Sequence, residues 1–156
     1  MKNPIDSIYQ KIIIQQYLQY RQDNSIILDS FSDDDMCLID ELYDYLQSKS
    51  GYIYIANNNI NAYYKVGMTK QNPNKRLKSL NSAGVFYELS FVRVFKTYDV
   101  FLEHLIHQTL YDLYPKAKFK EFFKLPLNLI EHIIQEELDR FNSFLSMFFP
   151  KHYIEK

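Results

Sequence analysis

Residues 51–69 read GYIYIANNNINAYYKVGMT and contain the clearest structural pattern of the chain. Residues 51–56 and 63–67 are rich in aromatic and β-branched side chains, which favour strands. The stretch 57–62 between them is rich in asparagine, which tolerates the left-handed backbone that hairpin loops require. The pattern predicts an antiparallel hairpin.

The alternation of side chains along this hairpin predicts which residues share a face of the sheet. Successive side chains of a strand point to opposite faces. We therefore expect Tyr54 on the first strand to share a face with Lys65 and Gly67 on the second. Tyr63 falls on the same side and is a candidate second phenol, whereas Tyr64 is expected in the core.

Helix and strand signals alternate after the hairpin. Asn72 followed by Pro73 is a typical helix start, and Pro115 ends a helical pattern. The elements predicted beyond the hairpin are a helix from residue 72, a third strand over 86–96, a helix over 99–114, a strand or ordered loop over 118–123, and a long helix from Pro126.

Helical spacing of apolar residues also precedes the hairpin, over residues 5–20 and 33–48. The apolar period changes from 3.6 to 2 next to Gly51. The predicted fold class is therefore α+β, a small antiparallel sheet flanked by helices. We expect an acidic helical accessory segment over 1–49, a sheet-containing domain over 50–150 and a tail over 151–156.

Charge is distributed unevenly along the 156 residues, although the net charge is only −1. Residues 1–50 carry 9 acidic and 4 basic side chains, and residues 61–124 carry 5 acidic and 11 basic ones. A basic segment suits a polyanion such as nucleic acid, because lysines and arginines near phosphates release counterions. A solvated lysine-rich face would look the same.

The chain has no apolar run of about 18 residues to cross a bilayer, and its first residues lack the layout of a signal peptide. We therefore expect an intracellular protein without a membrane partner: cytoplasmic, or nuclear or at a viral factory if the source is a eukaryotic virus. The single cysteine, Cys37, has no partner for an internal disulfide.

Several short motifs follow one another with specific spacing. They are Tyr52-Ile53-Tyr54, Tyr64-Lys65-Val66-Gly67-Met68-Thr69, Arg76-Leu77, Glu103 with His107, and Glu121-Phe122-Phe123. Their order resembles the GIY-YIG nuclease superfamily, and more specifically a phage- and virus-associated branch of it, over roughly residues 51–140. Two positions differ from the usual motifs: Tyr52 replaces a glycine, and Lys65 stands where many members carry a second tyrosine.

The resemblance implies a DNA endonuclease that hydrolyses phosphodiester bonds with one divalent cation, Mg²⁺ or Mn²⁺. It makes Tyr54 the candidate base, which must lie near positive charge because a free phenol has a pKa of about 10. Lys65 and Arg76 are the candidates to supply that charge, and Lys65 is an alternative group to orient or deprotonate the water. Gly67 either lets the backbone approach a phosphate or simply ends a strand.

The metal ligand implied by the resemblance is Glu103. His107 lies four residues later, so the two side chains stack on one helix face at the edge of the core. His107 is a candidate proton shuttle or phosphate ligand, and a structural partner of Glu103 is the alternative. Glu121 belongs to the resemblance but also suits an ordinary surface acid. The candidate DNA-binding residues are Lys70, Lys75, Arg76, Lys78, Lys118 and Lys120.

Two other function classes stay open. Lys65 in the second motif favours a catalytically inactive DNA-binding module on the same fold. The acidic, aromatic N-terminal segment favours a protein-interaction or regulatory factor, with a homodimer or protein partner held through the N-terminal helices. That segment either competes with DNA for the basic residues or completes an apolar core or dimer interface through residues such as Ile12, Ile13, Leu42 and Leu46.

Overall fold

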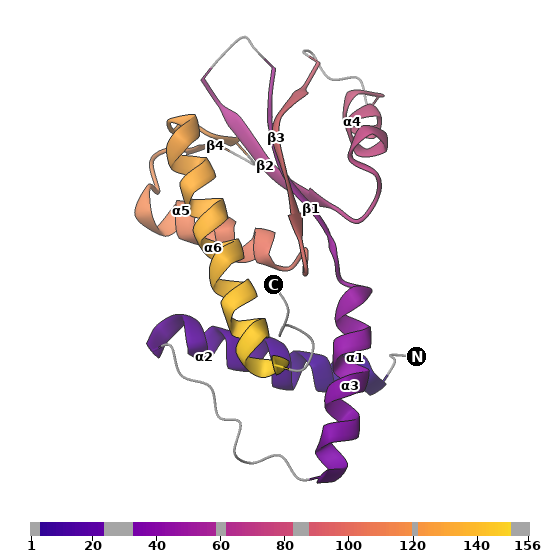
Figure 1. Ribbon diagram of the computed structural model, residues 1–156. Helices are drawn as coiled ribbons and strands as arrows, with labels where there is room; N and C mark the ends of the chain where they lie inside the picture. Colours follow the sequence, from indigo (N-terminus) through magenta and orange to yellow (C-terminus); the bar gives the residue numbers. More distant parts are fainter. Residues whose placement is uncertain (1–3, 24–32, 59–61, 83–87, 120–121, 151–156) are drawn as a thin grey trace. The chain divides into compact units, whose positions relative to one another are not determined.

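The computed structural model describes residues 4–23, 33–58, 62–82, 88–119 and 122–150 (Figure 1). The chain forms two compact units, one from Met1–Ser48 with Asp139–Lys156 and the other from Lys49–Leu138. The elements include helices and one antiparallel sheet, which confirms the predicted α+β class. The predicted tail over 151–156 lies outside the described residues.

The sheet of the Lys49–Leu138 unit contains the predicted hairpin at its centre. Its strands are β1 (Gly51–Asn57), β2 (Tyr64–Thr69), β3 (Ser90–Thr97), β4 (Lys118–Phe119) and β5 (Phe122–Phe123), in the order β3-β1-β2-β5-β4. Every strand pair is antiparallel. Residues 118–123, expected to be a strand or an ordered loop, contribute two short strands that extend the sheet beyond β2.

Two helices of this unit follow strands of the sheet. Helix α4 (Pro73–Ser82) begins as predicted, because the Asn72 side chain accepts a hydrogen bond from the backbone N–H of Asn74 at 2.8 Å. It lies beside β3 (Figure 1). Helix α5 (Leu102–Leu113) packs against β2.

Two predicted boundaries around β3 and α5 differ from the structure. Asp99 was expected to open the helix, but α5 begins three residues later, because the Asp99 carboxylate accepts the N–H of Phe101 in a turn that precedes the helix. The third strand begins at Ser90 rather than residue 86. Residues 86–87 lie outside the described ranges.

The core of the unit lies on both faces of β1. Ile53, Tyr54, Ile55 and Ala56 have no exposed surface, so the central strand is covered on both sides. Helix α5 buries Leu102, Leu105, Ile106 and Leu110. Leu113, the last residue of α5, is 59% exposed.

The other unit has an aromatic core. Its helices are α1 (Pro4–Tyr9), the π-helical turn Gln10–Ile14, α2 (Gln15–Asp23), α3 (Asp33–Gln47) and the C-terminal part of α6 (Leu127–Phe148). Tyr17 packs edge-on against Phe141, with ring centroids 4.8 Å apart, and Tyr20 packs against Phe144 at 5.6 Å. Ile13, Leu42 and Leu46 are fully buried, which supports the core role that the sequence left open for them.

Among the described residues, no helix is both long and apolar enough to cross a membrane.

Candidate functional site

Tyr54 lies in the central strand with its hydroxyl above Gly67. The pairing register sets Tyr54 opposite Gly67, and a Cβ atom on Gly67 would overlap the phenol ring and its oxygen. Gly67 is therefore needed for the close approach of the ring. The Tyr54 Oη is buried and has no hydrogen-bond partner among the described residues. A buried polar atom without a partner is rare in native proteins, and ligand binding or catalysis is one reason to retain it.

Lys65 shares the Tyr54 face of the sheet, as predicted. It pairs with Ala56, two residues beyond Tyr54 on β1, and with Phe122 on β5. Only 8% of Lys65 is exposed, and its Nζ lies 5.9 Å from the centre of the Phe122 ring. An ammonium held over an aromatic face is stabilised by the ring quadrupole. The structure thus places a positive charge on the face that carries the phenol.

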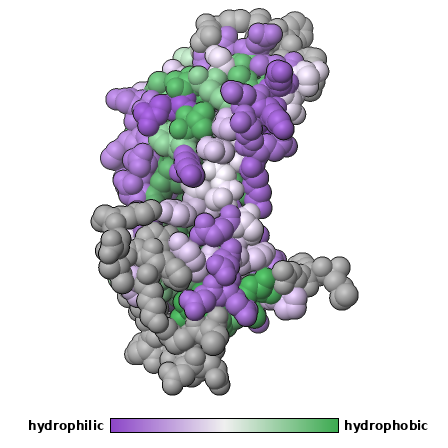
Figure 2. Space-filling model, turned by 45° about the vertical axis from the view of Figure 1, so that its right-hand side comes forward, coloured by the Kyte–Doolittle hydropathy of each residue, from purple (hydrophilic) through white to green (hydrophobic). Residues whose placement is uncertain are grey.

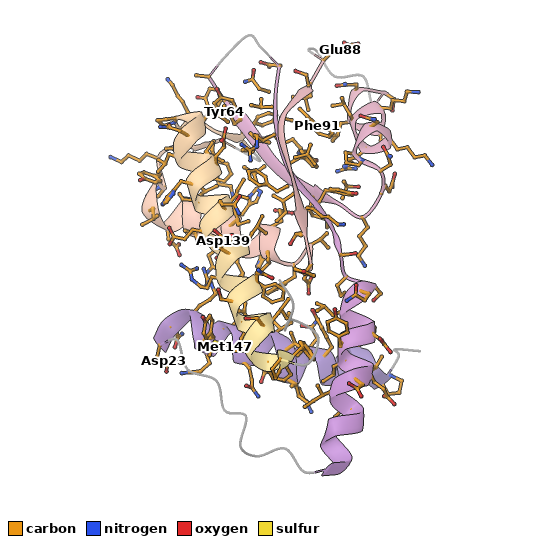
Figure 3. The ribbon with its side chains drawn as sticks, in the orientation of Figure 1. Asp23, Tyr64, Glu88, Phe91, Asp139 and Met147 are labelled. Atoms are coloured by element: carbon orange, nitrogen blue, oxygen red, sulfur yellow. The ribbon has the colours of Figure 1, made fainter. Side chains whose placement is uncertain are left out.

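Phe91 completes the surroundings of Tyr54 from β3. Its ring centroid lies 4.9 Å from that of Tyr54, and Figure 3 labels Phe91 and Tyr64 on the strands to either side of β1. Sequence reasoning did not select Phe91 because a phenylalanine in a strand is ordinary core composition. The apolar Val92 and Val94 on the same strand are exposed. Figure 2 shows apolar patches among hydrophilic surface in the upper part of the view, at the height where Figure 1 draws the sheet.

Arg76 lies in the first turn of α4, where its N–H donates to the Asn72 carbonyl at 3.1 Å. Its Nε atom is buried and, like the Tyr54 hydroxyl, makes no hydrogen bond with any described residue. A guanidinium near a helix N-terminus is suited to bidentate binding of phosphate. Within the described ranges, the Tyr54 hydroxyl makes no hydrogen bond to Arg76.

Glu103 and His107 form a pair on α5 that reaches the edge of β2. The His107 Nε2 lies 2.9 Å from Glu103 Oε1 and 2.6 Å from the carbonyl oxygen of Val66. Both neighbours accept hydrogen bonds, so Nε2 carries the proton and donates to them. Val66 directly follows Lys65, which pairs with Phe122 of β5. His107 therefore links the candidate metal ligand to the strand of the second motif.

The ring of Phe123 packs against the ring of His107. Its ring centroid lies 5.2 Å from that of His107, and its side chain has no exposed surface. Phe123 pairs with Tyr64 across β5 and β2, on the face opposite to Tyr54. Parts of three separated motifs, those of β2, α5 and Phe122-Phe123, thus meet at one place in the fold.

His107 is more easily protonated than an ordinary histidine. Burial disfavours the imidazolium, but the hydrogen bonds to Glu103 and to the Val66 carbonyl and the charge of Glu103 outweigh burial, and the pKa of His107 is raised above about 6.5. The ammonium of Lys118 acts in the opposite direction. The side chains of His107 and Glu103 are 19% and 23% exposed, so both remain accessible to water.

The donor set at Glu103 fits a single hard divalent cation. Mg²⁺ commonly takes one or two carboxylates and fills the remaining positions with water and phosphate oxygens. Glu103 offers one partly exposed carboxylate, of which one oxygen faces His107. In the ranges that the structure describes, no group of three or more His, Cys, Asp or Glu is arranged to hold a metal.

Most predicted DNA-binding lysines are solvent-exposed. Lys70, Lys75, Lys78 and Lys118 are exposed, whereas Arg76 is half-buried. Lys120 and Glu121 lie outside the described residues. Tyr63, the candidate second phenol, precedes β2, and its carbonyl accepts a hydrogen bond from the Asn57 side chain at 2.7 Å.

The structure therefore forms two separate groups from the predicted site residues, because Phe123, which contacts His107, lies on the sheet face opposite to Tyr54. Tyr54 and Lys65 share one face of the sheet, and Glu103 and His107 are bonded to each other and to β2. The aromatic neighbours Phe91, Phe122 and Phe123 support these groups, and two of them lie in a motif that the sequence had already singled out.

Comparison with protein families identifies residues 51–140: they match the T5orf172 domain, a phage-associated domain in the context of GIY-YIG and HNH-like endonucleases. No curated protein and no solved structure matches the chain.

Proposed function

The chain belongs to the T5orf172 domain family, and we propose that it is a divalent-metal-dependent DNA endonuclease of the GIY-YIG type. The observation that carries the proposal is the Tyr54 hydroxyl, which is buried above Gly67 without a hydrogen-bond partner among the described residues. A buried hydroxyl without a partner costs about 1–3 kcal/mol. A role in the reaction would explain why the oxygen is retained.

Each side chain has a role that its surroundings support. The Tyr54 oxygen accepts a proton from the attacking water, and Lys65 places a positive charge on the same face of the sheet. Arg76 binds the scissile phosphate. When bound at Glu103, Mg²⁺ or Mn²⁺ supplies neutralisation of charge on the phosphate.

The proposed role of His107 is to orient Glu103. Its single Nε2–H group is shared between the carboxylate and the Val66 carbonyl, so it holds the carboxylate at a fixed place beside β2. An orienting hydrogen bond of this kind restricts the rotation of a ligand side chain.

A plasmid-nicking assay with Mg²⁺, with Mn²⁺ and with EDTA tests the proposal, together with a gel-shift assay in EDTA. We expect cleavage only with metal. Glu103→Gln should lower the cleavage rate about 100-fold or more, because charge stabilisation of this kind is usually among the largest catalytic contributions. Its DNA binding in EDTA should be unchanged.

The chain provides a matched control in the exposed pair of His132 and Glu136 on α6. These residues also lie four apart, with His132 Nε2 3.2 Å from Glu136 Oε2. Glu136→Gln removes the same kind of interaction elsewhere and should cleave like the wild type. Cleavage in EDTA, or an active Glu103→Gln variant, would contradict the metal assignment.

The specific observation that favours a second function is Lys65, which stands where many GIY-YIG nucleases carry a tyrosine. A wild-type protein that binds DNA but cleaves with neither metal would be a binding module on the same fold. Restoring cleavage with Lys65→Tyr would then show that this position limits the chemistry.

A further inference from the structure

Beyond the residues already assigned, α5 carries an exposed side chain next to His107 on the helix surface. Tyr111 lies four residues after His107, and residues spaced by four stack along one helix face. The rise of the helix places Tyr111 about 12 Å from Glu103 along the axis, or three to four nucleotide spacings of a duplex strand. Tyr111 is 50% exposed.

His107 and Tyr111 on α5 contact neighbouring strands of the sheet. His107 contacts Val66 of β2 and Phe123 of β5, and Tyr111 contacts Lys118 of the outermost strand β4. Lys118 pairs with Phe123 across the two short strands. The sheet register thus brings Lys118 to the side that faces α5.

Tyr111 and Lys118 form an exposed aromatic and cationic pair. The Lys118 Nζ lies 5.4 Å from the centre of the Tyr111 ring, and Lys118 itself is exposed. Two more exposed lysines, Lys116 and Lys124, lie in the adjoining segments. One nearby acid, Asp112, is exposed on α5 at the next position around the helix.

We propose that Tyr111 and Lys118 form a nucleic-acid contact that holds the DNA strand to one side of the scissile phosphate. Lys118 binds a backbone phosphate, and the Tyr111 ring packs on the adjoining sugar or base. Aromatic rings beside positive charges are the usual combination for holding a single strand without reading its sequence. This inference rests on the proposed function and extends it by a binding surface outside the reacting groups.

The test is fluorescence anisotropy with full-length protein in EDTA, using a nonspecific labelled single-stranded oligonucleotide at several salt concentrations. Tyr111→Ala should weaken binding about tenfold without changing the salt slope, because stacking involves no counterion release. Tyr111→Phe, which keeps the ring, should bind within about twofold of wild type. Lys118→Ala should weaken binding and lower the slope of log K against log salt by about 0.7.

Two controls match these changes. Leu113→Ala removes another exposed apolar side chain from the same helix, and Lys11→Ala removes a lysine from the other unit. Both should bind like the wild type. Thermal melting of each variant confirms that it is folded.

The outcomes separate this inference from the proposed function. Wild type that fails to bind DNA overturns both. Wild type that binds, with Tyr111→Ala and Lys118→Ala binding equally well, overturns the contact alone. Equal losses for Tyr111→Ala and Leu113→Ala, or an unchanged salt slope for Lys118→Ala, also overturn it.

Discussion

Tyr54 combines a structural and a proposed chemical property in one side chain. Its ring is part of the core, fully buried against Phe91 and above Gly67, while its oxygen has no hydrogen-bond partner in the described parts of the chain. The ring therefore contributes to folding, and the hydroxyl does not contribute through a hydrogen bond. These two contributions can be separated by experiment.

We predict that Tyr54→Phe keeps the stability of the protein but loses cleavage. Removing a hydroxyl without a partner costs no hydrogen bond, so the free energy of unfolding should be unchanged or slightly higher. The cleavage rate should fall about 100- to 10,000-fold, as expected for loss of a general base. Urea unfolding and plasmid nicking measure the two effects. A variant that cleaves normally would make Lys65 or a metal-bound hydroxide the base.

The raised pKa of His107 predicts a pH-dependent contribution to stability. A group that binds its proton more tightly when folded stabilises the fold fully below its unfolded pKa, about 6.5 for histidine. The contribution is lost as the pH rises through the higher folded pKa. The stability difference between wild type and His107→Gln, measured by urea unfolding without metal, should be larger at about pH 5.5 than at about pH 8.5. A stability difference that grows with pH would contradict the raised pKa of His107.

At the scale of elements, the short hairpin of β4 and β5 has more influence than its length suggests. Phe123 on β5 is fully buried and contacts His107, and β5 pairs with β2 at Tyr64 and Lys65. The two residues of β5 thus join the second motif to the helix that carries Glu103.

We predict that Phe123→Ala destabilises the protein by about 3–5 kcal/mol, the usual cost of removing a buried phenylalanine ring. Phe123→Leu, which refills most of the space, should cost less. Urea unfolding measures both. If Phe123→Ala unfolds like wild type, the ring does not support the fold and the link between β5 and His107 is weak.

Local patterns were sufficient to predict most elements and the shared face of Tyr54 and Lys65. A strand repeats every two residues, so the hairpin register alone brings these two side chains to one side. The Asn72 and Pro73 signal likewise located the start of α4. By contrast, the pairing of Phe123 with Tyr64 joins residues far apart in the chain and has no local signal. Tyr111 could have been found by extending the spacing of Glu103 and His107 by four residues.

At the scale of the whole molecule, the chain divides between a sheet unit that holds the predicted site residues and a helical unit that combines both ends of the chain. The sequence predicted α6 as a long helix but not that its last residues would pack with Tyr17 and Tyr20. Helix spacing defines which face is buried and not which partner covers it.

We predict that a chain beginning at Lys49 aggregates. Residues 1–48 cover Phe141, Phe144 and Phe149 with aromatic side chains, and their removal exposes a large apolar surface. Size-exclusion chromatography measures the outcome. A chain of residues 49–138, which also lacks those phenylalanines, is the control and should be more soluble. A soluble monomer of residues 49–156 would contradict the core role of the N-terminal helices.

The acidic character of the N-terminal helices predicts an effect on DNA binding that can be tested without truncation. Glu41 and Asp44 of α3 are exposed, so Glu41→Gln with Asp44→Asn removes two charges without opening the core. If the acidic segment competes with DNA for the basic segment, this variant binds nonspecific DNA more tightly, and the gain disappears at about 1 M salt as charges are screened.

The control is Glu88→Gln with Glu136→Gln, which removes the same charge from exposed positions of the sheet unit. Because both variants change the net charge equally, a larger gain for the α3 variant can only come from where its charges lie. Equal gains would instead mean that net charge alone governs binding, and the competition hypothesis would be wrong.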